Sequence, residues 1–148
     1  MELTTLCYIR KNDHTLMLHR IKKNEDPNKG KWIGVGGHLE ENESPEECII
    51  REIREETGLK ANKVSLKGIL TFILPKWGNE LTFLYVCDDF EGEITECDEG
   101  ELKWIGNDKI KDLPLWEGDR YFLDRLDEKD PFELKLIYDD QDNLIRVI

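Results

Sequence analysis

The chain has 148 residues, of which 39% are hydrophobic and 36% charged, so it can bury a core and has the size of one ordinary domain. Its 33 acidic residues outnumber its 21 basic ones, and the net charge of −12 argues against binding a nucleic-acid duplex, which usually needs basic patches. Residues 1–20 lack a signal-peptide core, no apolar run could span a membrane, and the four cysteines form no Cys-x-x-Cys pair. We therefore expect a cytoplasmic protein with reduced thiols and no membrane partner.

The N-terminal part of the chain predicts two strands and a loop. Residues 3–10 (LTTLCYIR) and 15–21 (TLMLHRI) are rich in β-forming residues and are joined by the polar turn 11–14. Residues 24–31 (NEDPNKGK) form a polar loop that leads into the glycine-rich segment 32–37 (WIGVGG). The chain is therefore expected to begin with a β-hairpin.

The clearest helix covers residues 44–57 (SPEECIIREIREET). Ser44 is a good N-cap, Pro45 suits the first helical position, and Glu47 completes a capping box. Gly58 follows the last helical residue and is typical of a helix end. Local signals thus predict both ends of this helix.

Further elements follow in the second half of the chain. They are a hairpin of strands 64–74 and 80–90 around the turn 75–79, a strand at 100–105, a helix at 115–126 and a closing hairpin at 132–148. Strands interrupted by two helices, without a repeat or a linker, predict one domain over residues 1–148. Its expected class is α/β (α+β), with a mixed β-sheet between helices.

The first helix carries a costly group of acids. Glu52, Glu55 and Glu56 fall at i, i+3 and i+4 and share one face, where like charges destabilise an isolated helix by roughly 0.2–0.5 kcal/mol per pair. A solvated acidic face is the ordinary interpretation, but this one follows Gly36 and Gly37, whose backbone a ligand can approach closely. A carbonyl with three carboxylates suits Mg²⁺ or Mn²⁺. The pattern therefore predicts a metal site.

The same residues carry a family resemblance. Gly37, Glu43 and the segment 51–59 (REIREETGL) match the Nudix box at every defined position, over 23 residues. The resemblance implies the Nudix fold, a mixed β-sheet sandwiched between α-helices. It also implies metal-dependent hydrolysis of a nucleoside diphosphate linked to another group.

The resemblance also implies roles for individual residues. Arg51 and Glu43 would form the ion pair that orients the loop and the helix, and Glu52 would position or deprotonate the attacking water. Mg²⁺ is the implied cofactor, with Mn²⁺ as an alternative. The implied ligands are the carbonyl oxygen of Gly36 and the carboxylates of Glu52, Glu55 and Glu56.

Two further stretches, GKWIGVGGHLEENE and ECDEGELKWI…LPLWEGDRYF, look like the MutT-type branch that hydrolyses oxidised purine nucleoside triphosphates. Glu99 falls where that branch has a further metal-binding or base carboxylate, and Lys23 falls near a residue that could reach a phosphate. Trp116 falls on the base-stacking tryptophan, and Asp119 on one of two aspartates that read the purine edge. From the residues alone, packing of Trp116, a helix N-terminal role for Asp119 and solvation of Glu99 and Lys23 are equally open.

The chain departs from that branch at two positions, with Gly118 in place of the first aspartate and Ile33 in place of a base-reading asparagine. The expected function is Mg²⁺-dependent hydrolysis of a small-molecule nucleotide, in which 8-oxo-dGTP is converted to 8-oxo-dGMP and pyrophosphate. The expected oligomeric state is a monomer or a homodimer. One alternative is another Nudix substrate, foremost ADP-ribose, because Pro75 lies about where that branch has a marker proline. A more remote alternative is a non-catalytic nucleotide-binding module.

Overall fold

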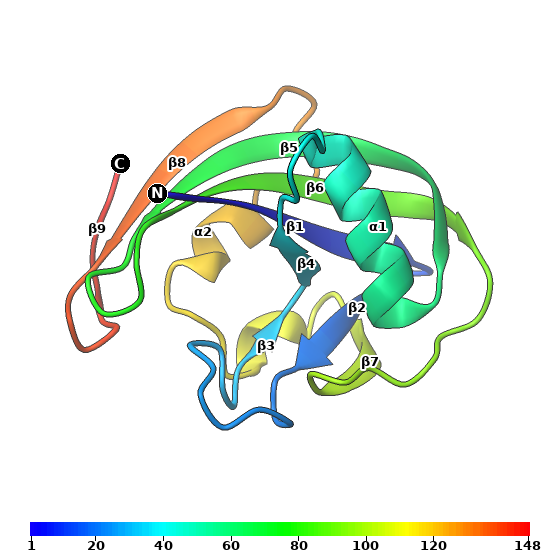
Figure 1. Ribbon diagram of the computed structural model, residues 1–148, viewed down its shortest axis with the longest axis horizontal. Helices are drawn as coiled ribbons and strands as arrows, with labels where there is room; N and C mark the ends of the chain where they lie inside the picture. The colour runs from blue at the N-terminus through cyan, green and yellow to red at the C-terminus, as the bar shows by residue number, and fades with distance from the viewer.

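The computed structural model describes all residues from 1 to 148. Its elements, in chain order, are β1 (Glu2–Lys11), β2 (His14–His19), β3 (Trp32–Ile33), β4 (Val35–His38), α1 (Pro45–Thr57), β5 (Lys60–Ile73), β6 (Glu80–Glu91), β7 (Glu101–Gly106), a 3-10 turn (Ile110–Asp112), α2 (Asp119–Leu123), β8 (Phe132–Tyr138) and β9 (Leu144–Val147). Figure 1 shows the long strands β1, β5 and β6 arching over the molecule, with α1 along one side.

The strands form one mixed sheet in the order β3-β2-β1-β6-β5-β8-β9, with β4 paired to β1 and β7 paired to β2. The β1–β6 and β5–β8 pairs are parallel and the other named pairs are antiparallel. β1 changes partner along one edge, because Thr4–Cys7 pair with β4 and Ile9–Lys11 pair with β2. The predicted mixed sheet is confirmed.

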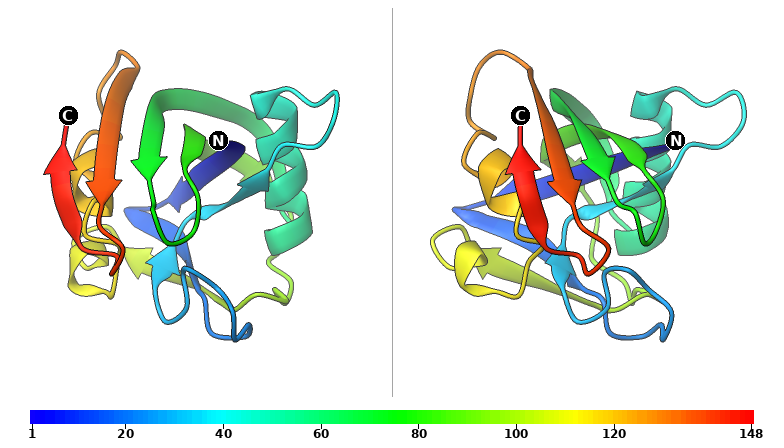
Figure 2. Two further views of the ribbon diagram at one scale, coloured as in Figure 1. Left: turned by 60° about the vertical axis from the view of Figure 1, so that its left-hand side comes forward. Right: turned by 90° about the vertical axis from the view of Figure 1, so that its left-hand side faces the viewer.

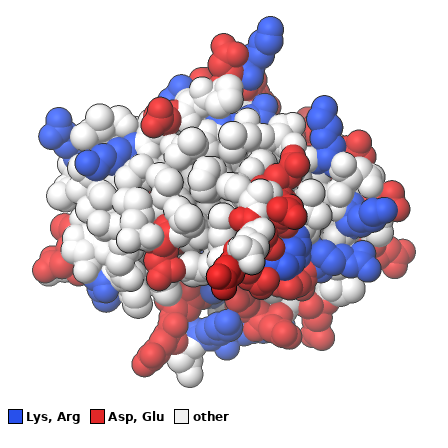
Figure 3. All heavy atoms as spheres, turned by 45° about the horizontal axis from the view of Figure 1, so that its top comes forward, with Lys and Arg blue, Asp and Glu red and all other residues white.

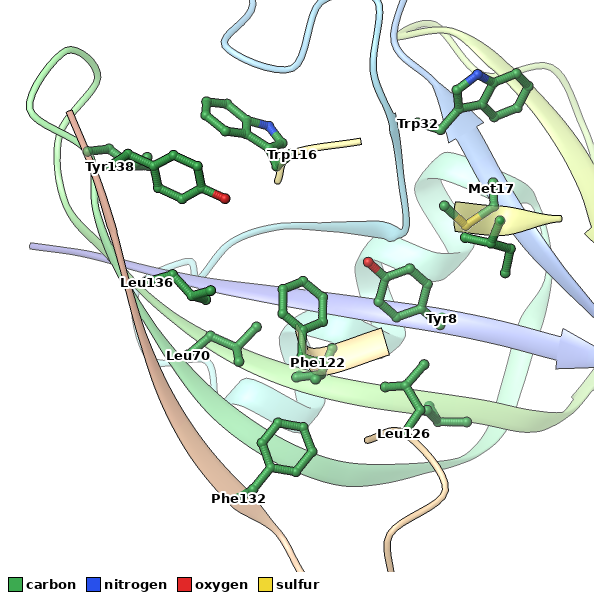
Figure 4. Packing of buried hydrophobic residues seen from close by; sticks show 14 residues of the cluster. Tyr8, Met17, Trp32, Leu70, Trp116, Phe122, Leu126, Phe132, Leu136 and Tyr138 are labelled. Carbon is green, nitrogen blue, oxygen red and sulfur yellow. The ribbon is translucent and has the colours of Figure 1, made fainter. Parts of the chain in front are cut away.

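The two helices cover opposite faces of this sheet. On β1, Tyr8 packs against Phe122 of α2 with ring centroids 6.3 Å apart, whereas Cys7 and Ile9 belong to the buried cluster that contains Ile53 of α1. Since successive side chains of a strand point to opposite faces, α2 and α1 lie on opposite sides of β1. Figure 4 shows the larger cluster of 14 buried residues on the α2 side.

Local signals account for α1 as predicted. The Ser44 side chain accepts a hydrogen bond from the Glu47 backbone N–H at 3.1 Å, and the Glu47 carboxylate accepts one from the Ser44 N–H at 3.0 Å. Gly58 ends the helix at φ 80°, a left-handed conformation that glycine adopts without strain. The predicted hairpins are also present, as β5–β6 and β8–β9.

The second predicted helix is much shorter than residues 115–126. Only Asp119–Leu123 are helical, and Gly118 precedes them without a side-chain cap. The backbone N–H of Asp119 bonds to the carbonyl of Trp116, and the N–H of Arg125 to that of Phe122, so single turns flank the helix. Burial of Trp116 and Phe122 on the sheet, rather than helix propensity, sets the path here.

The strands beyond residue 126 join the same sheet. Figure 2 shows the β8–β9 hairpin beside α2 and away from α1.

Neither α1 nor α2, with 13 and 5 residues, has the length and apolarity that crossing a membrane requires. All four cysteines are buried and unpaired. On the face drawn in Figure 3, charged side chains gather mainly around the edge and leave an uncharged surface near the centre.

Candidate active site

A cleft of about 690 Å³ opens on the face of the sheet that α2 covers. Thr4, Thr5, Leu6 and Tyr8 of β1 line it. We call one group of its lining residues the acidic end: Gly36, Gly37, Arg51, Glu52, Glu55 and Glu99. We call another group the aromatic end: Asn28, Ile33, Phe72, Trp116 and Asp119.

Two glycines let the acidic end pack tightly. A Cβ on Gly37 would lie 2.6 Å from the Glu52 carboxyl carbon, and a Cβ on Gly36 would lie 1.9 Å from the Thr5 carbonyl oxygen. With no Cβ there, the Gly36 N–H donates to Oε2 of Glu56 at 2.8 Å. The glycine pair therefore brings α1 and its carboxyl groups against the backbone of β4.

Arg51 organises the carboxylates on the exposed side of this end. Its Nε and Nη2 donate to the two oxygens of Glu43 at 2.7 and 2.9 Å, a bidentate pair that lowers the pKa of Glu43 to about 2. Its Nη1 donates to Glu52 at 2.8 Å and to Glu55 at 3.1 Å. The ion pair between Arg51 and Glu43 that the resemblance implies is thus present.

Glu56 does not line the cleft, but it contacts Glu99 on the buried side of the acidic end. Burial, followed by the neighbouring Glu99, raises the pKa of Glu56 to about 9. Burial also acts to raise the pKa of Glu99, but Glu56 and Arg20 favour its charged form and leave that pKa below its usual value. Glu99 accepts a hydrogen bond from Arg20 at 2.9 Å and another from Lys23 at 3.2 Å. The structure therefore brings Glu99 and Lys23 to the acidic end.

The donor chemistry of this end suits a hard divalent cation, because most of its oxygen donors are carboxylates. Burial raises the pKa of Glu52 and that of Glu56, so without a cation nearby their charged forms are disfavoured. No three His, Cys, Asp or Glu side chains converge closely enough to hold a metal ion, since Arg51 holds Glu52 and Glu55. A cation would have to draw these side chains away from the arginine. The groups that could then hold it are the Gly36 carbonyl and Glu52, Glu55, Glu56 and Glu99.

Trp116 dominates the aromatic end. Its Nε1 donates to Oδ1 of Asn28 at 2.7 Å, and the Lys31 ammonium lies 4.6 Å from the ring centroid. Tyr138 packs edge-on against the ring with the centroids 5.1 Å apart. Figure 4 shows the two side chains near each other. Neither Lys31 nor Tyr138 lines the cleft, whereas Trp116 does. The ring is therefore packed on its outer sides and contributes its remaining surface to the cleft.

Asp119 is buried beside this ring, with only 5% of its surface exposed, and lines the cleft. Burial raises its pKa to about 8, although Lys31 and Arg120 act to lower that pKa. Burial, followed by the charge of Asp119, raises the pKa values of Tyr8 and Tyr138. Over most of the neutral range this carboxyl group is therefore protonated and able both to donate and to accept a hydrogen bond.

The structure shows what surrounds positions 118 and 33, where the chain departs from the MutT-type branch. A Cβ on Gly118 would lie 2.6 Å from both the Tyr138 hydroxyl and a methyl group of Leu136. The Gly118 N–H donates to that hydroxyl at 2.8 Å. Tyr138 therefore occupies the space where an aspartate at position 118 would begin, while Ile33 lines the cleft as an apolar residue.

Several lining residues had no signal in the sequence. Glu80 and Thr82 alternate along β6, a pattern that indicates a shared face but not that the face borders a cleft. Arg20, Asp26 and Asn28 lie in or beside a polar loop, where the ordinary expectation is solvation. Only the fold shows that this loop borders both ends of the cleft.

Comparison with known proteins agrees with this geometry. The family model described as NUDIX domain matches residues 2–126. The chain is 35% identical over 130 residues to the Nudix hydrolase YvcI of Bacillus subtilis (strain 168), covering 84% of this chain and 78% of that protein. It is 30% identical over 118 residues to the oxidized purine nucleoside triphosphate hydrolase of Mus musculus, covering 78% and 75%.

A relative with another named substrate also matches. The ADP-ribose pyrophosphatase of Methanocaldococcus jannaschii is 32% identical over 94 residues, covering 63% of this chain and 54% of that protein. Among solved structures, the mutator MutT protein of Bacillus halodurans superposes with a TM-score of 0.87 at 27% identity, covering 100% of this chain and 97% of that one. With its matched domain, its fold and its unbroken motif, this chain belongs to the Nudix hydrolase family.

Proposed function

We propose that the protein is a Mg²⁺-dependent nucleoside triphosphate pyrophosphohydrolase that acts on oxidised purine nucleotides. In the proposed reaction, water attacks one phosphorus and the P–O bond between the nucleoside monophosphate and the pyrophosphate breaks, for example from 8-oxo-dGTP to 8-oxo-dGMP and pyrophosphate. The observation that carries the proposal is that one cleft is lined both by the carboxylates of Glu52, Glu55 and Glu99 and by the Trp116–Asp119 pair. A nucleotide has the same two-part character, with an anionic chain and a flat base.

Nudix hydrolases generally use a divalent metal such as Mg²⁺. When bound, the metal would neutralise the phosphate oxygens and lower the pKa of a water molecule. We propose that the Gly36 carbonyl and Glu52, Glu55, Glu56 and Glu99 hold it.

The remaining roles at the acidic end follow from contacts. Arg51 fixes the loop before α1 through Glu43. The Glu52 carboxylate, once a cation has drawn it away from Arg51, would position the attacking water and accept its proton. Lys23, half exposed beside Glu99, would contact a phosphate.

At the aromatic end, the part of the Trp116 ring that lines the cleft would stack on the base. The protonated Asp119 carboxyl group would offer one donor and one acceptor to the edge of the purine. Because Gly118 and Ile33 supply no polar side chain, Asp119 would carry more of the reading of the base than a pair of aspartates would.

ADP-ribose is the second candidate, and the named activity of the Methanocaldococcus jannaschii relative favours it. Pro75 does not support it in the same way, because this residue is exposed in the β5–β6 turn and does not line the cleft. A non-catalytic module would have no reason to keep mutually repelling carboxyl groups together.

A substrate panel tests the proposal. Purified protein with Mg²⁺ is given 8-oxo-dGTP, other purine and pyrimidine triphosphates and ADP-ribose, and the products are identified by chromatography. We expect the highest kcat/KM on an oxidised purine triphosphate, with release of pyrophosphate. Faster turnover of ADP-ribose than of every triphosphate would overturn the substrate class, and no turnover at all would favour a binding module.

A further inference from the structure

A continuous set of hydrogen bonds joins the two ends of the cleft through residues 20–31, which connect β2 to β3. It runs from Glu99 through Arg20, Asp26 and Asn28 to Trp116. Each step is between 2.7 and 3.0 Å, within the range of normal hydrogen bonds. We call these five residues the bridge.

The first half of the bridge is a buried ion pair. Arg20 donates from Nε to Asp26 Oδ2 at 2.7 Å and from Nη1 to Glu99 Oε2 at 2.9 Å. The Arg20 and Asp26 side chains are only 13% and 2% exposed, so removing Arg20 would leave the Asp26 charge buried without an ionic partner, whereas Arg20 without Asp26 would still pair with Glu99. Arg20 is thus shared between Asp26 and the carboxylate of the acidic end.

The second half reaches the aromatic end. The other oxygen of Asp26 accepts from the backbone N–H of Asn28 at 3.0 Å. The Asn28 side-chain oxygen accepts from Nε1 of Trp116 at 2.7 Å. The indole N–H is the only donor on that ring, so this bond is the one hydrogen bond that the ring can donate.

Backbone bonds already hold the shape of the loop. The backbone N–H of Gly30 donates to the carbonyl of Arg20 at 2.7 Å, and the N–H of Arg20 donates to the carbonyl of Lys31 at 3.0 Å. The N–H of Lys29 donates to the backbone carbonyl of Asp26 at 3.0 Å. The side chains of Asp26 and Asn28 are therefore not required to close the loop. They are directed instead towards groups that line the cleft.

We propose that Asp26 and Asn28 are positioning residues that couple the orientation of Trp116 to that of Glu99. Asn28 sets the plane of the ring on which a base would stack, and Asp26 limits how tightly Arg20 holds Glu99. The identity of the ligand at Trp116 rests on the proposed function, whereas the coupling within the protein does not.

The first test measures the coupling without any substrate. The indole N–H of Trp116 is assigned by NMR from the signal that disappears in Trp116→Phe. We expect Asn28→Ala to shift this signal and speed its exchange with solvent, while Asn28→Asp, which keeps an acceptor, leaves it close to the wild type. Asp26→Asn should also move the signal, although Asp26 does not contact the ring. The control is Asn24→Ala, because Asn24 lies in the same loop and bonds only to Lys29.

The second test uses binding and turnover. Asn28→Ala should raise KM for a purine triphosphate about five- to tenfold, the worth of one hydrogen bond, with kcat nearly unchanged, and Asn28→Asp should restore it. Asp26→Asn should mainly lower kcat, through Glu99, and the double variant should be non-additive.

An Asp26→Asn protein whose Trp116 signal stays at the wild-type position would overturn the coupling. So would equal effects of Asn28→Ala and Asn24→Ala. If the signals move as expected but no triphosphate is hydrolysed, the bridge stands and the proposed function fails. If Asp26→Asn does not fold, Asp26→Glu, which retains the charge on a longer side chain, is measured in its place, and an unmoved Trp116 signal again overturns the proposal.

Discussion

Carboxyl groups crowd the acidic end of the cleft and are held there by arginines, whereas the aromatic end has a single carboxyl group, Asp119, buried among rings. At the acidic end, burial and the neighbouring Glu99 disfavour the charged form of Glu56, so this end carries a cost in stability. At the aromatic end Trp116 belongs to the larger core cluster and contributes to stability while it shapes the cleft. Changes at the two ends should therefore have opposite effects on stability, although changes at either end should lower activity.

The largest effect should come from breaking the acidic end. Glu52→Gln or Glu56→Gln should lower kcat by about three orders of magnitude or more, because each removes a carboxylate that a metal or the attacking water needs. The melting temperature of the metal-free protein should stay the same or rise, because each variant removes an ionisable group whose charged form burial disfavours. Steady-state kinetics and calorimetry measure both.

The matched control is Glu46→Gln, an exposed acid in the first turn of the same helix. It should retain activity. Mg²⁺ should stabilise the wild type by mass action, by ~2.7 kcal/mol at a hundredfold excess over Kd, and the two active-site variants much less. Full activity of either variant, or of the wild type in excess EDTA, would contradict the metal site.

Asp119 should make stability fall as pH rises. Its folded pKa is about 8 and its ordinary value 3.8, so between these values the unfolded chain has released the proton that the folded protein keeps. The free energy of unfolding therefore decreases with pH in this window, on the order of a few kcal/mol in total, and levels off above about pH 8.

Asp119→Asn tests this directly, because an amide of similar shape does not titrate. Denaturant unfolding of both proteins at pH 5, 6, 7 and 8 should show the variant gaining stability relative to the wild type at each step. A constant difference across these pH values would mean that Asp119 is not held neutral in the folded protein. In activity assays the same variant should change the preference among purines.

Breaking the aromatic end should affect substrates unequally. Trp116→Ala removes a stacking interaction of about 1–3 kcal/mol, or roughly 5–150-fold in kcat/KM, for an oxidised purine triphosphate. The loss should be small for pyrophosphate compounds that lack this base. Because Trp116 is also packed against Tyr138, the variant should be less stable as well, unlike the glutamate variants of the acidic end.

Trp77→Ala is the control, since that ring is 41% exposed at the β5–β6 turn. It should change neither stability nor kcat/KM appreciably. An equal loss of kcat/KM on every substrate in Trp116→Ala would indicate that the ring only packs and does not stack on the base.

The two ends also differ in how far the sequence predicts them. The glutamates of α1, its capping box and Gly58 lie within one continuous segment, so helical periodicity and capping rules place them without tertiary contacts. The aromatic end joins the 20–31 loop, α2 and β8, and no local pattern brings Asn28 to Trp116 or Tyr138 to Gly118. The second helix was predicted too long for the same reason, because burial of Trp116 and Phe122 determines where it begins and ends.

The smallest effect should come from Pro75, the residue that suggested ADP-ribose. It lies at the start of the β5–β6 turn, where the N–H groups of Trp77 and Gly78 bond to the Leu74 carbonyl at 3.1 and 2.8 Å. These bonds hold the turn without it, and Pro75 itself is exposed and does not line the cleft. Pro75→Ala should therefore leave kcat/KM within about twofold of the wild type on triphosphates and on ADP-ribose alike, and lower stability by at most about 1 kcal/mol. A selective loss on ADP-ribose alone would place a ligand against this turn and would transfer the proposed substrate specificity from the aromatic end to the hairpin.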